Sequence, residues 1–178
     1  HSAMPIQTAK RLCPQAIIVG GTRGEYSKYS RWVTEIIAAK APLFEKASID
    51  EFYLDLTGMD RFFDPWQWTI ELRQEIIDKT QLPISFALAS NKLISKIATN
   101  EAKPNGYVQI PFGMEREYLA PLRVNKIPGV GEHLYQAMQE LGINTIGDLA
   151  NQPIEFLENR FGKFGGDLWN KAHGIHHS

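Results

Sequence analysis

The sequence lacks most of the features that anchor or cross-link a protein. Its 178 residues contain one cysteine, Cys13, so disulfides are not part of the architecture and a reducing, cytoplasmic compartment is expected. No apolar run is long enough to span a bilayer, which argues against a membrane partner, and no signal-peptide pattern opens the chain. Internal repeats and low-complexity segments are also missing from the sequence.

Neither sign of charge is in excess. The chain has 19 basic and 20 acidic residues and a formal net charge of −1. Nucleic-acid binders usually carry a basic surplus, so any contact with nucleic acid must use local patches or backbone groups. Hydrophobic content is 43%, which is ordinary for a globular protein. The length allows one domain with a sizeable core or two small domains.

Residues 47–56 are the most informative stretch, because they alternate apolar and polar residues around two adjacent carboxylates, Asp50 and Glu51. The alternation predicts a β-hairpin or a bent strand. Two like charges repel and resist desolvation, a cost that a divalent cation between them would offset. Neighbours on a regular strand face opposite sides, so we expect a bend that lets both reach a metal. The alternative is a solvated pair in a hairpin turn.

The first two thirds of the chain alternate helix and strand patterns. Residue spacing predicts helices at 6–12, 26–39, 66–79 and 91–102, strands at 16–19, 84–89 and 107–110, and turns at Gly20-Gly21 and 103–106. Ser90 is the expected N-cap of the fourth helix. This order indicates an α+β fold, with a mostly antiparallel sheet covered by helices.

After Pro111 the strand signals vanish, and we place a boundary between Pro111 and Pro121. Short helices separated by Gly- and Pro-bearing turns follow, including a helix at 132–141 that Gly142 ends and a Thr145 capping box. The loop before that helix, residues 127–131, reads Ile-Pro-Gly-Val-Gly.

This loop is typical of a helix–hairpin–helix. In that motif small residues let backbone N–H groups reach a DNA phosphate without reading sequence. We therefore assign DNA contact to Gly129, Val130 and Gly131. The alternative is a tight helix–helix turn that binds nothing.

Three segments together resemble the Y-family (translesion) DNA polymerases, of the bacterial DNA polymerase IV type. Residues 47–55, Ala-Ser-Ile-Asp-Glu-Phe-Tyr-Leu-Asp, resemble the carboxylate signature of that family. Residues 89–98 and 102–106 resemble its second palm signature, and the loop at 127–131 resembles its thumb. The resemblance covers essentially the whole chain.

The resemblance implies a remnant of the fingers at 1–22, a palm at 23–116 and an all-helical, helix–hairpin–helix thumb at 117–178. Family members start upstream with a strand that bears a first metal-binding Asp, and end with a little-finger domain. The chain is therefore expected to be an internal fragment. We expect it to be inactive alone, because a third carboxylate is missing.

The resemblance also implies roles for particular residues. Asp50 and Glu51 would be catalytic and hold two Mg²⁺ ions, Lys103 would neutralise the incoming triphosphate, and Ser48 would help to order the site. Lys92 would contact DNA; a solvated surface lysine is the alternative for it and for Lys103.

The implied parent is a template-directed, error-prone polymerase of DNA repair and damage bypass. Its partners would be primer–template DNA, deoxynucleoside triphosphates and, through its C-terminal region, the replication sliding clamp. An exposed palm edge would favour self-association. A non-catalytic, sequence-independent DNA-binding module acting through the thumb is the alternative function.

Overall fold

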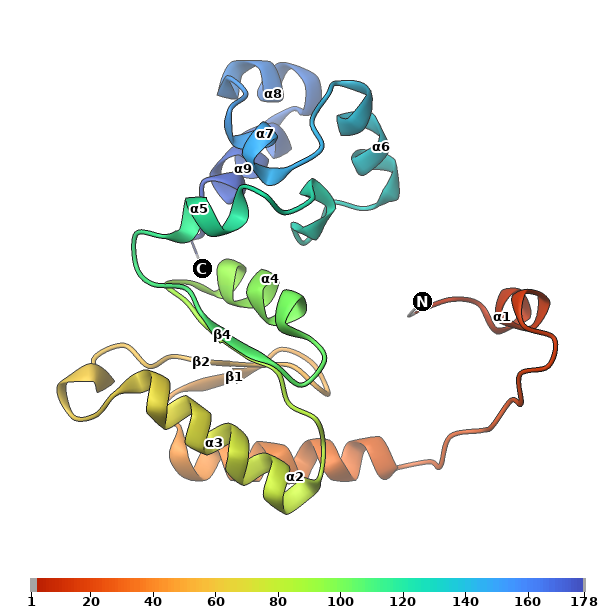
Figure 1. Ribbon diagram of the computed structural model, residues 1–178, viewed down its shortest axis with the longest axis vertical. Helices are drawn as coiled ribbons and strands as arrows, with labels where there is room; N and C mark the ends of the chain where they lie inside the picture. Colours follow the sequence, from red (N-terminus) through yellow and green to blue (C-terminus); the bar gives the residue numbers. More distant parts are fainter. Residues whose placement is uncertain (1–2, 178) are drawn as a thin grey trace.

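The structure is a computed structural model that describes residues 3–177 (Figure 1). Short strands lie in the lower half of the molecule, between two long helices on one side and a third helix on the other. The helices below are α2 (Glu25–Lys40) and α3 (Pro65–Thr80), and the helix above is α4 (Lys92–Ala102). An all-helical unit lies beyond α4. The expected α+β class with a helical second part is confirmed.

The strands form two separate two-stranded sheets. Strand β1 (Phe44–Lys46) pairs with β2 (Phe52–Leu54) antiparallel, as the hairpin pattern predicts. Strand β3 (Phe86–Leu88) pairs with β4 (Tyr107–Gln109) in parallel. The sheet is thus divided, and only one of its halves is antiparallel. The reason is that α4 connects β3 to β4 and returns the chain in the same direction, as parallel pairing requires.

Capping side chains fix where two of the helices begin. The Asp64 carboxylate accepts a hydrogen bond from the Trp66 amide at 3.0 Å and starts α3. The N-cap of α4 is Asn91 rather than the predicted Ser90, because Asn91 has extended backbone angles and its Oδ1 accepts from the Ile94 amide at 3.0 Å. Two cap-forming residues are adjacent here, and the hydrogen bond decides between them.

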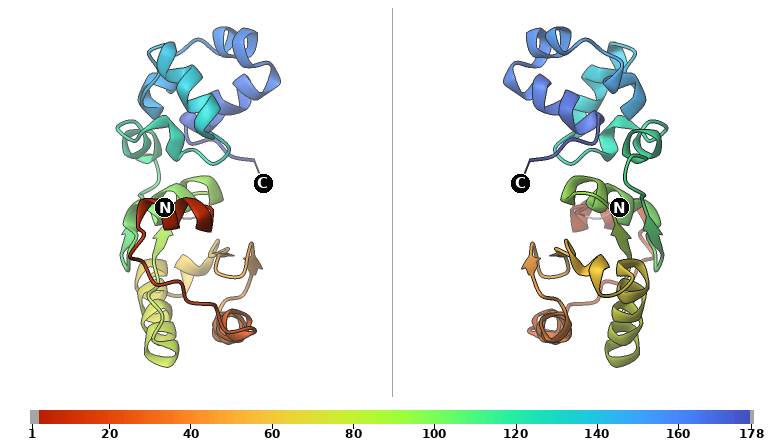
Figure 2. Two further views of the ribbon diagram at one scale, coloured as in Figure 1. Left: turned by 90° about the vertical axis from the view of Figure 1, so that its right-hand side faces the viewer. Right: turned by 90° about the vertical axis from the view of Figure 1, so that its left-hand side faces the viewer.

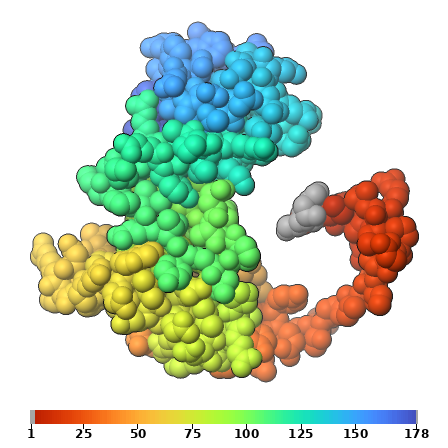
Figure 3. Space-filling model, in the orientation of Figure 1, coloured from red at the N-terminus to blue at the C-terminus, as the bar shows by residue number. Residues whose placement is uncertain are grey.

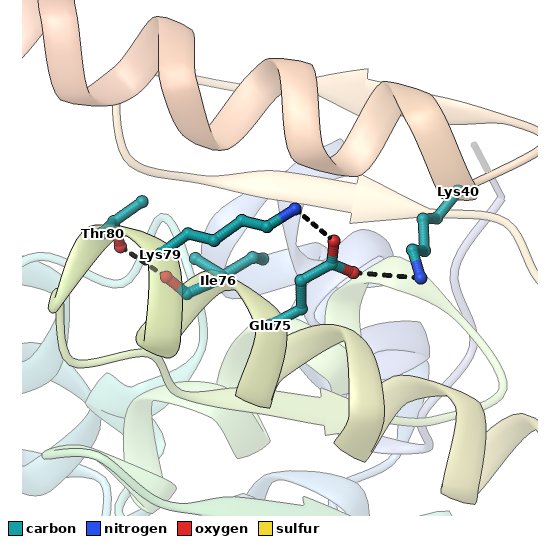
Figure 4. A network of polar contacts seen from close by, with 5 residues as sticks. All are labelled: Lys40, Glu75, Ile76, Lys79 and Thr80. Carbon is teal, nitrogen blue, oxygen red and sulfur yellow. Dashed lines mark hydrogen bonds and ion pairs between the residues drawn. The ribbon is translucent and has the colours of Figure 1, made fainter.

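Helices α2 and α3 are tied together at one end by Glu75 (Figure 4). The Glu75 carboxylate lies 2.7 Å from Lys79 Nζ on its own helix and 3.1 Å from Lys40 Nζ at the end of α2. The hydrogen bonds from Lys79 and Lys40 hold the pKa of Glu75 below its ordinary value of 4.5. One turn on, the Thr80 hydroxyl donates to the Ile76 carbonyl at 2.7 Å, within the end of α3.

The N-terminal arm before α2 lies apart from the rest of the molecule (Figures 1 and 3). Its helix α1 (Ile6–Leu12) is confirmed but buries no residue. The predicted strand at 16–19 is wrong: Ile17 and Val19 are 88% and 83% exposed, and the segment has no regular structure. A strand needs a partner edge, and no segment within 3–177 pairs with it. Gly20 and Gly21 likewise form no turn.

Everything described after β4 is helix, turn or loop, apart from one isolated bridge between Arg123 and Thr145. The helices are α5 (Glu115–Leu119), α6 (Glu132–Glu140), α7 (Ile146–Ala150), α8 (Ile154–Phe161) and α9 (Lys163–Ala172), with a 3-10 turn at Val124–Lys126. Another 3-10 turn, at Met59–Arg61, lies earlier in the chain, between β2 and α3. The predicted signals at the helix ends are present, since Gly142 has φ +77° after α6 and Thr145 forms a capping box with Asp148.

Two hydrophobic cores hold the fold. The smaller core lies between α2, α3 and the first hairpin, with its buried residues at Val33, Ile36, Ile37, Ala41, Leu72 and Ile76. The larger core joins one face of α4 and Ile110 to all the helices of the second unit. The side views show α4 directly beneath that unit (Figure 2). None of the helices described within 3–177 combines the length and hydrophobicity needed to cross a membrane.

Candidate metal and nucleic-acid site

Asp50 and Glu51 lie in the connection between β1 and β2. Residues 48–50 form the predicted bend, so the pair is not inside a regular strand. The Glu51 carbonyl accepts hydrogen bonds from the Ala47 amide at 2.9 Å and the Ser48 amide at 3.2 Å, which closes the connection into a tight loop. The side chains of Asp50 and Glu51 therefore need not point to opposite faces, as neighbours on a regular strand would.

Two serines fix this loop. Ser30 on α2 is 6% exposed, and its hydroxyl donates to the Ile49 carbonyl at 2.5 Å. The Ser48 hydroxyl donates to Asp50 Oδ1 at 2.9 Å. Ser30 is a part of the site that sequence reasoning missed. It lies on a helix far from the carboxylates in sequence, and no local pattern links the two.

Two lysines of α4 form ion pairs with carboxylates of the hairpin. Lys96 Nζ lies 3.4 Å from Glu51 Oε2, and Lys92 Nζ lies 2.6 Å from Glu45 Oε2. The lysines are four residues apart, so they share one helix face. Lys92 also lies 5.8 Å from the centre of the Tyr53 ring. Such partly exposed ion pairs contribute little stability, and a stronger ligand for either partner can replace them.

A groove of about 1770 Å³ runs between β2 and β3. Its wall includes Asp50, Glu51, Lys92, Lys96 and Lys103. All residues of β2 and β3 line it, whereas β4 contributes none. The structure therefore brings the predicted carboxylates, the predicted triphosphate lysine and the first turns of α4 to one open space.

Asp55 belongs to the same signature but is used locally. Its carboxylate accepts from the Thr57 hydroxyl at 2.6 Å and the Thr57 amide at 3.0 Å. These two bonds, with a smaller contribution from the charge of Lys92, hold the pKa of Asp55 below its ordinary value of 3.8. Asp55 also lines the groove, but its carboxylate is engaged within the turn after β2, which it stabilises.

The donor set fits a hard divalent cation. Carboxylate oxygens are the ligands that Mg²⁺ prefers, and Mg²⁺ commonly takes one or two carboxylates together with waters and substrate phosphates. Within residues 3–177 no third His, Cys, Asp or Glu converges with the pair into a metal-binding group. Asp50 and Glu51 could therefore supply part of the coordination of such an ion, and they do not make an all-protein cage.

The glycine loop before α6 has two open positions. Gly129 has φ +94°, which favours glycine, and Gly131 is the N-cap of α6. A Cβ at either position would meet nothing within 4 Å. Val130 differs, because its side chain is 7% exposed within the larger core and its amide donates to the Ile127 carbonyl at 3.1 Å. Of the three loop residues predicted to contact DNA, Val130 thus has its amide engaged internally.

The fold and site define an α+β protein in which a carboxylate hairpin faces a lysine-bearing helix, next to a helical unit with an open glycine loop. Residues 1–100 match the model of the impB/mucB/samB family, and residues 125–176 match the model described as DNA polymerase-iota, thumb domain. The chain belongs to the impB/mucB/samB family, and the resemblance to Y-family polymerases is confirmed.

Named relatives agree with this assignment. DNA polymerase IV of Dehalococcoides mccartyi (strain ATCC BAA-2266 / KCTC 15142 / 195) is 37% identical over 176 residues, which are 98% of this chain and 45% of the relative. DNA polymerase IV of Xanthomonas euvesicatoria pv. vesicatoria (strain 85-10) is 41% identical, again over 98% of this chain and over 49% of the relative. The chain therefore spans about half the length of the curated relatives it matches.

Solved structures give the same fold. The crystal structure of DinB from Sulfolobus solfataricus superposes with a TM-score of 0.87 at 30% identity, over 98% of this chain and 52% of that one. The insertion ternary complex of Dbh DNA polymerase has a TM-score of 0.86 at 29% identity, over 100% of this chain and 53% of that one.

Proposed function

We propose that this chain is the palm–thumb portion of a template-directed, error-prone DNA polymerase that copies past damage. The observation that carries the proposal is the convergence of Asp50, Glu51 and Lys103 on one groove. The polymerase names of the relatives support it. With it we propose the division into a fingers remnant at 1–22, a palm at 23–116 and a thumb at 117–178, and a cytoplasmic location.

In this proposal Asp50 and Glu51 are the catalytic carboxylates and hold Mg²⁺. When bound, the metal supplies charge stabilisation at the attacked phosphate and the leaving oxygens. Ser48 orients Asp50 through the 2.9 Å hydrogen bond, and the Lys96 ammonium offsets the charge of Glu51. Lys103 neutralises the triphosphate of an incoming deoxynucleotide.

The groove between β2 and β3 is also where a strand bearing the missing carboxylate could lie. The strands on its two sides belong to different sheets, so an additional strand between them would join the halves. We propose that an upstream strand of the parent fills this gap and carries the third carboxylate. The contact with the sliding clamp, which the resemblance assigns to the parent's C-terminal region, remains a proposal about the longer protein.

Primer extension with Mg²⁺ and all four deoxynucleotides tests the catalytic proposal. The chain alone should give no extension, and efficient extension would contradict the need for a third carboxylate. Metal binding is tested separately by Mn²⁺ titration, with NMR line broadening as the readout. Broadening should centre on residues 48–51 and be lost in Asp50→Asn and in Glu51→Gln. The control Glu45→Gln should retain it, and broadening elsewhere would argue against this site.

A second candidate function, sequence-independent DNA binding by the glycine loop, is favoured by the open space at Gly129 and Gly131. Gly131 has φ −82° and ψ 179°, which any residue adopts, so Gly131→Asp should leave the fold intact. We expect it to weaken binding to primer–template DNA, and Gly129→Asp with Gly131→Asp to weaken it further. Gln139→Glu adds the same charge at the other end of α6. Equal affinities for Gly131→Asp and Gln139→Glu would contradict loop contact.

The open groove supports self-association of the chain, because unpaired strand edges recruit other strands. We propose concentration-dependent association between β2 or β3 edges of separate copies. Sedimentation velocity over a wide concentration range tests this. A single monomeric species at the highest concentration would contradict it.

A further inference from the structure

Arg73 makes an unusually complete set of contacts for a partly exposed side chain. From the middle of α3, its Nε donates to the Ile84 carbonyl at 2.8 Å. Its Nη2 donates to both oxygens of Asn105, the carbonyl at 3.0 Å and Oδ1 at 2.9 Å. The guanidinium thus connects α3 to the start of β3 and to the turn before β4. Arg73 thereby links α3, which belongs to the smaller core, to the strands β3 and β4, which pack against the larger core.

An aromatic stack holds the guanidinium from its other side. Arg73 Cζ lies 4.8 Å from the centre of the Tyr107 ring. Tyr107 in turn stacks on Phe86, with the ring planes 6° apart, and lies 5.6 Å from Trp66. A planar guanidinium can donate in its plane and stack on a ring face at once, and a lysine ammonium cannot do both in the same way.

The turn that Arg73 contacts is itself closely fitted. Asn105 has φ +51°, and a Cβ on Gly106 would lie 2.3 Å from the Ala102 carbonyl oxygen. The Gly106 amide donates to the Ser85 hydroxyl at 3.2 Å, and its carbonyl accepts from the Phe86 amide at 3.3 Å. The backbone of this turn is therefore constrained on one side by β3 and on the other by Arg73.

Lys103 lies two residues before Asn105 and lines the same groove as Asp50 and Glu51. Among the residues that the structure describes, no hydrogen bond or ion pair involves its side chain, whereas Lys92 and Lys96 are both paired. Arg73 directs its own donors to backbone and amide oxygens. Among the described residues, Lys103 is thus the lysine of this turn that lines the groove with an unpaired ammonium.

We propose that Arg73 is a positioning residue for Lys103: it holds residues 103–106 so that the Lys103 ammonium faces the groove. This inference rests on the proposed role of Lys103 in binding a triphosphate. The forked contact of Arg73 with Asn105 stiffens the turn, and the stiffer turn raises the affinity of Lys103 for phosphate.

A double-mutant cycle on the full chain tests the coupling, with inorganic tripolyphosphate as the probe and ³¹P NMR titration as the readout. Arg73→Lys should weaken binding at least threefold while keeping the charge, and Lys103→Met should weaken it too. The double variant should bind no more weakly than Lys103→Met alone, because Arg73 acts only through Lys103. Additive losses would overturn the proposal. Arg31→Lys, an exposed position on α2, is the matched control and should bind like the wild type.

A second measurement judges the positioning directly. Backbone ¹⁵N relaxation of Asn105 and Gly106 should show increased fast motion in Arg73→Lys but not in Arg31→Lys, while melting curves confirm that both variants fold. If Lys103→Met binds tripolyphosphate like the wild type, the triphosphate role has failed, and relaxation alone decides whether Arg73 fixes the turn. Unchanged relaxation in Arg73→Lys overturns the inference.

Discussion

The two cores of the molecule differ in size and in completeness of burial. The larger core, which joins α4 to the second unit, contains many side chains with essentially no exposed surface. The smaller core beneath the carboxylate hairpin has six buried residues, each retaining 4–8% exposure. The glycine loop proposed to bind DNA is therefore carried by the well-packed part, and the carboxylate pair proposed to bind metal by the thinner one. Local opening should begin in the thinner part.

Disrupting the larger core at a backbone contact should have the largest effect. A Cβ on Gly165 of α9 would lie 2.1 Å from the Leu157 carbonyl oxygen. We expect Gly165→Ala to destabilise the chain by about 5 kcal/mol, in the range of severe packing defects. The neighbouring Gly166 would meet only the flexible end of Glu158 at 3.0 Å. Denaturant titration should show Gly166→Ala close to the wild type, and similar losses for the two would refute this account of the packing.

Equal truncations in the two cores compare them directly. Leu168 is 0% exposed in the larger core, and Leu72 is 5% exposed in the smaller. We expect Leu168→Ala to cost about 4 kcal/mol and Leu72→Ala about 2.5 kcal/mol. Hydrogen exchange should show faster exchange throughout α2 and α3 for Leu72→Ala, with α6–α9 still protected. Loss of protection in both parts together would mean that the cores unfold as one.

The capping box of α7 tests a smaller contribution to the larger core. Thr145 Oγ1 accepts from the Asp148 amide at 3.0 Å, so Thr145→Ala should cost about 1 kcal/mol in thermal or denaturant unfolding. The reciprocal bonds from the Asn144 and Thr145 amides lower the pKa of Asp148 below 3.8.

The lowered pKa of Asp148 gives the sign of its pH dependence. Its stabilisation is complete above the unfolded-state pKa and is lost as pH falls through the lower folded-state pKa. Asp148→Asn keeps an acceptor oxygen but removes the charge. The difference in unfolding free energy between Asp148→Asn and the wild type should therefore be constant near neutral pH and shrink below pH 3.8. A difference that grows on acidification would contradict the assigned hydrogen bonds.

The smallest effect is expected at Glu75, which joins α2 and α3 on the surface of the smaller core. Lys40 and Lys79 remain solvated, so Glu75→Gln should change the melting temperature less than Thr145→Ala does. Any change should fade as salt is added. A large, salt-independent loss would mean that Glu75 carries more of the α2–α3 contact than its exposure indicates.

Most of the fold could be predicted because local signals determine it. Helix periodicity gave α2 and α3, Gly142 marked the end of α6, and Thr145 with Asp148 identified a capping box. The failures depend on tertiary partners. The apolar residues 16–19 form no strand because nothing within the described chain pairs with them, and the parallel pairing of β3 with β4 follows from α4 crossing between them.

The candidate site shows the same division. The bend at Asp50 and Glu51 could be expected, because adjacent carboxylates on a regular strand point apart. The contacts of Ser30 with the Ile49 carbonyl, and of Arg73 with the Asn105 carbonyl, could not, since each joins residues far apart in sequence through a backbone oxygen that leaves no mark on residue type. Nor could the sequence indicate that the Val130 amide is used internally.

The sharing of one core by α4 and the second unit decides how the polypeptide can be dissected. Cutting near Pro111, where the composition changes, would leave Ile94, Ile97 and Ala98 on one piece and their partners on the other. Both pieces would then expose large apolar surfaces and aggregate. A cut at Pro83, between the two cores, would instead keep β3, α4, β4 and the whole second unit together. The boundary between the two packed cores therefore lies about thirty residues before the change in composition, and it differs from the proposed palm–thumb division at residue 116.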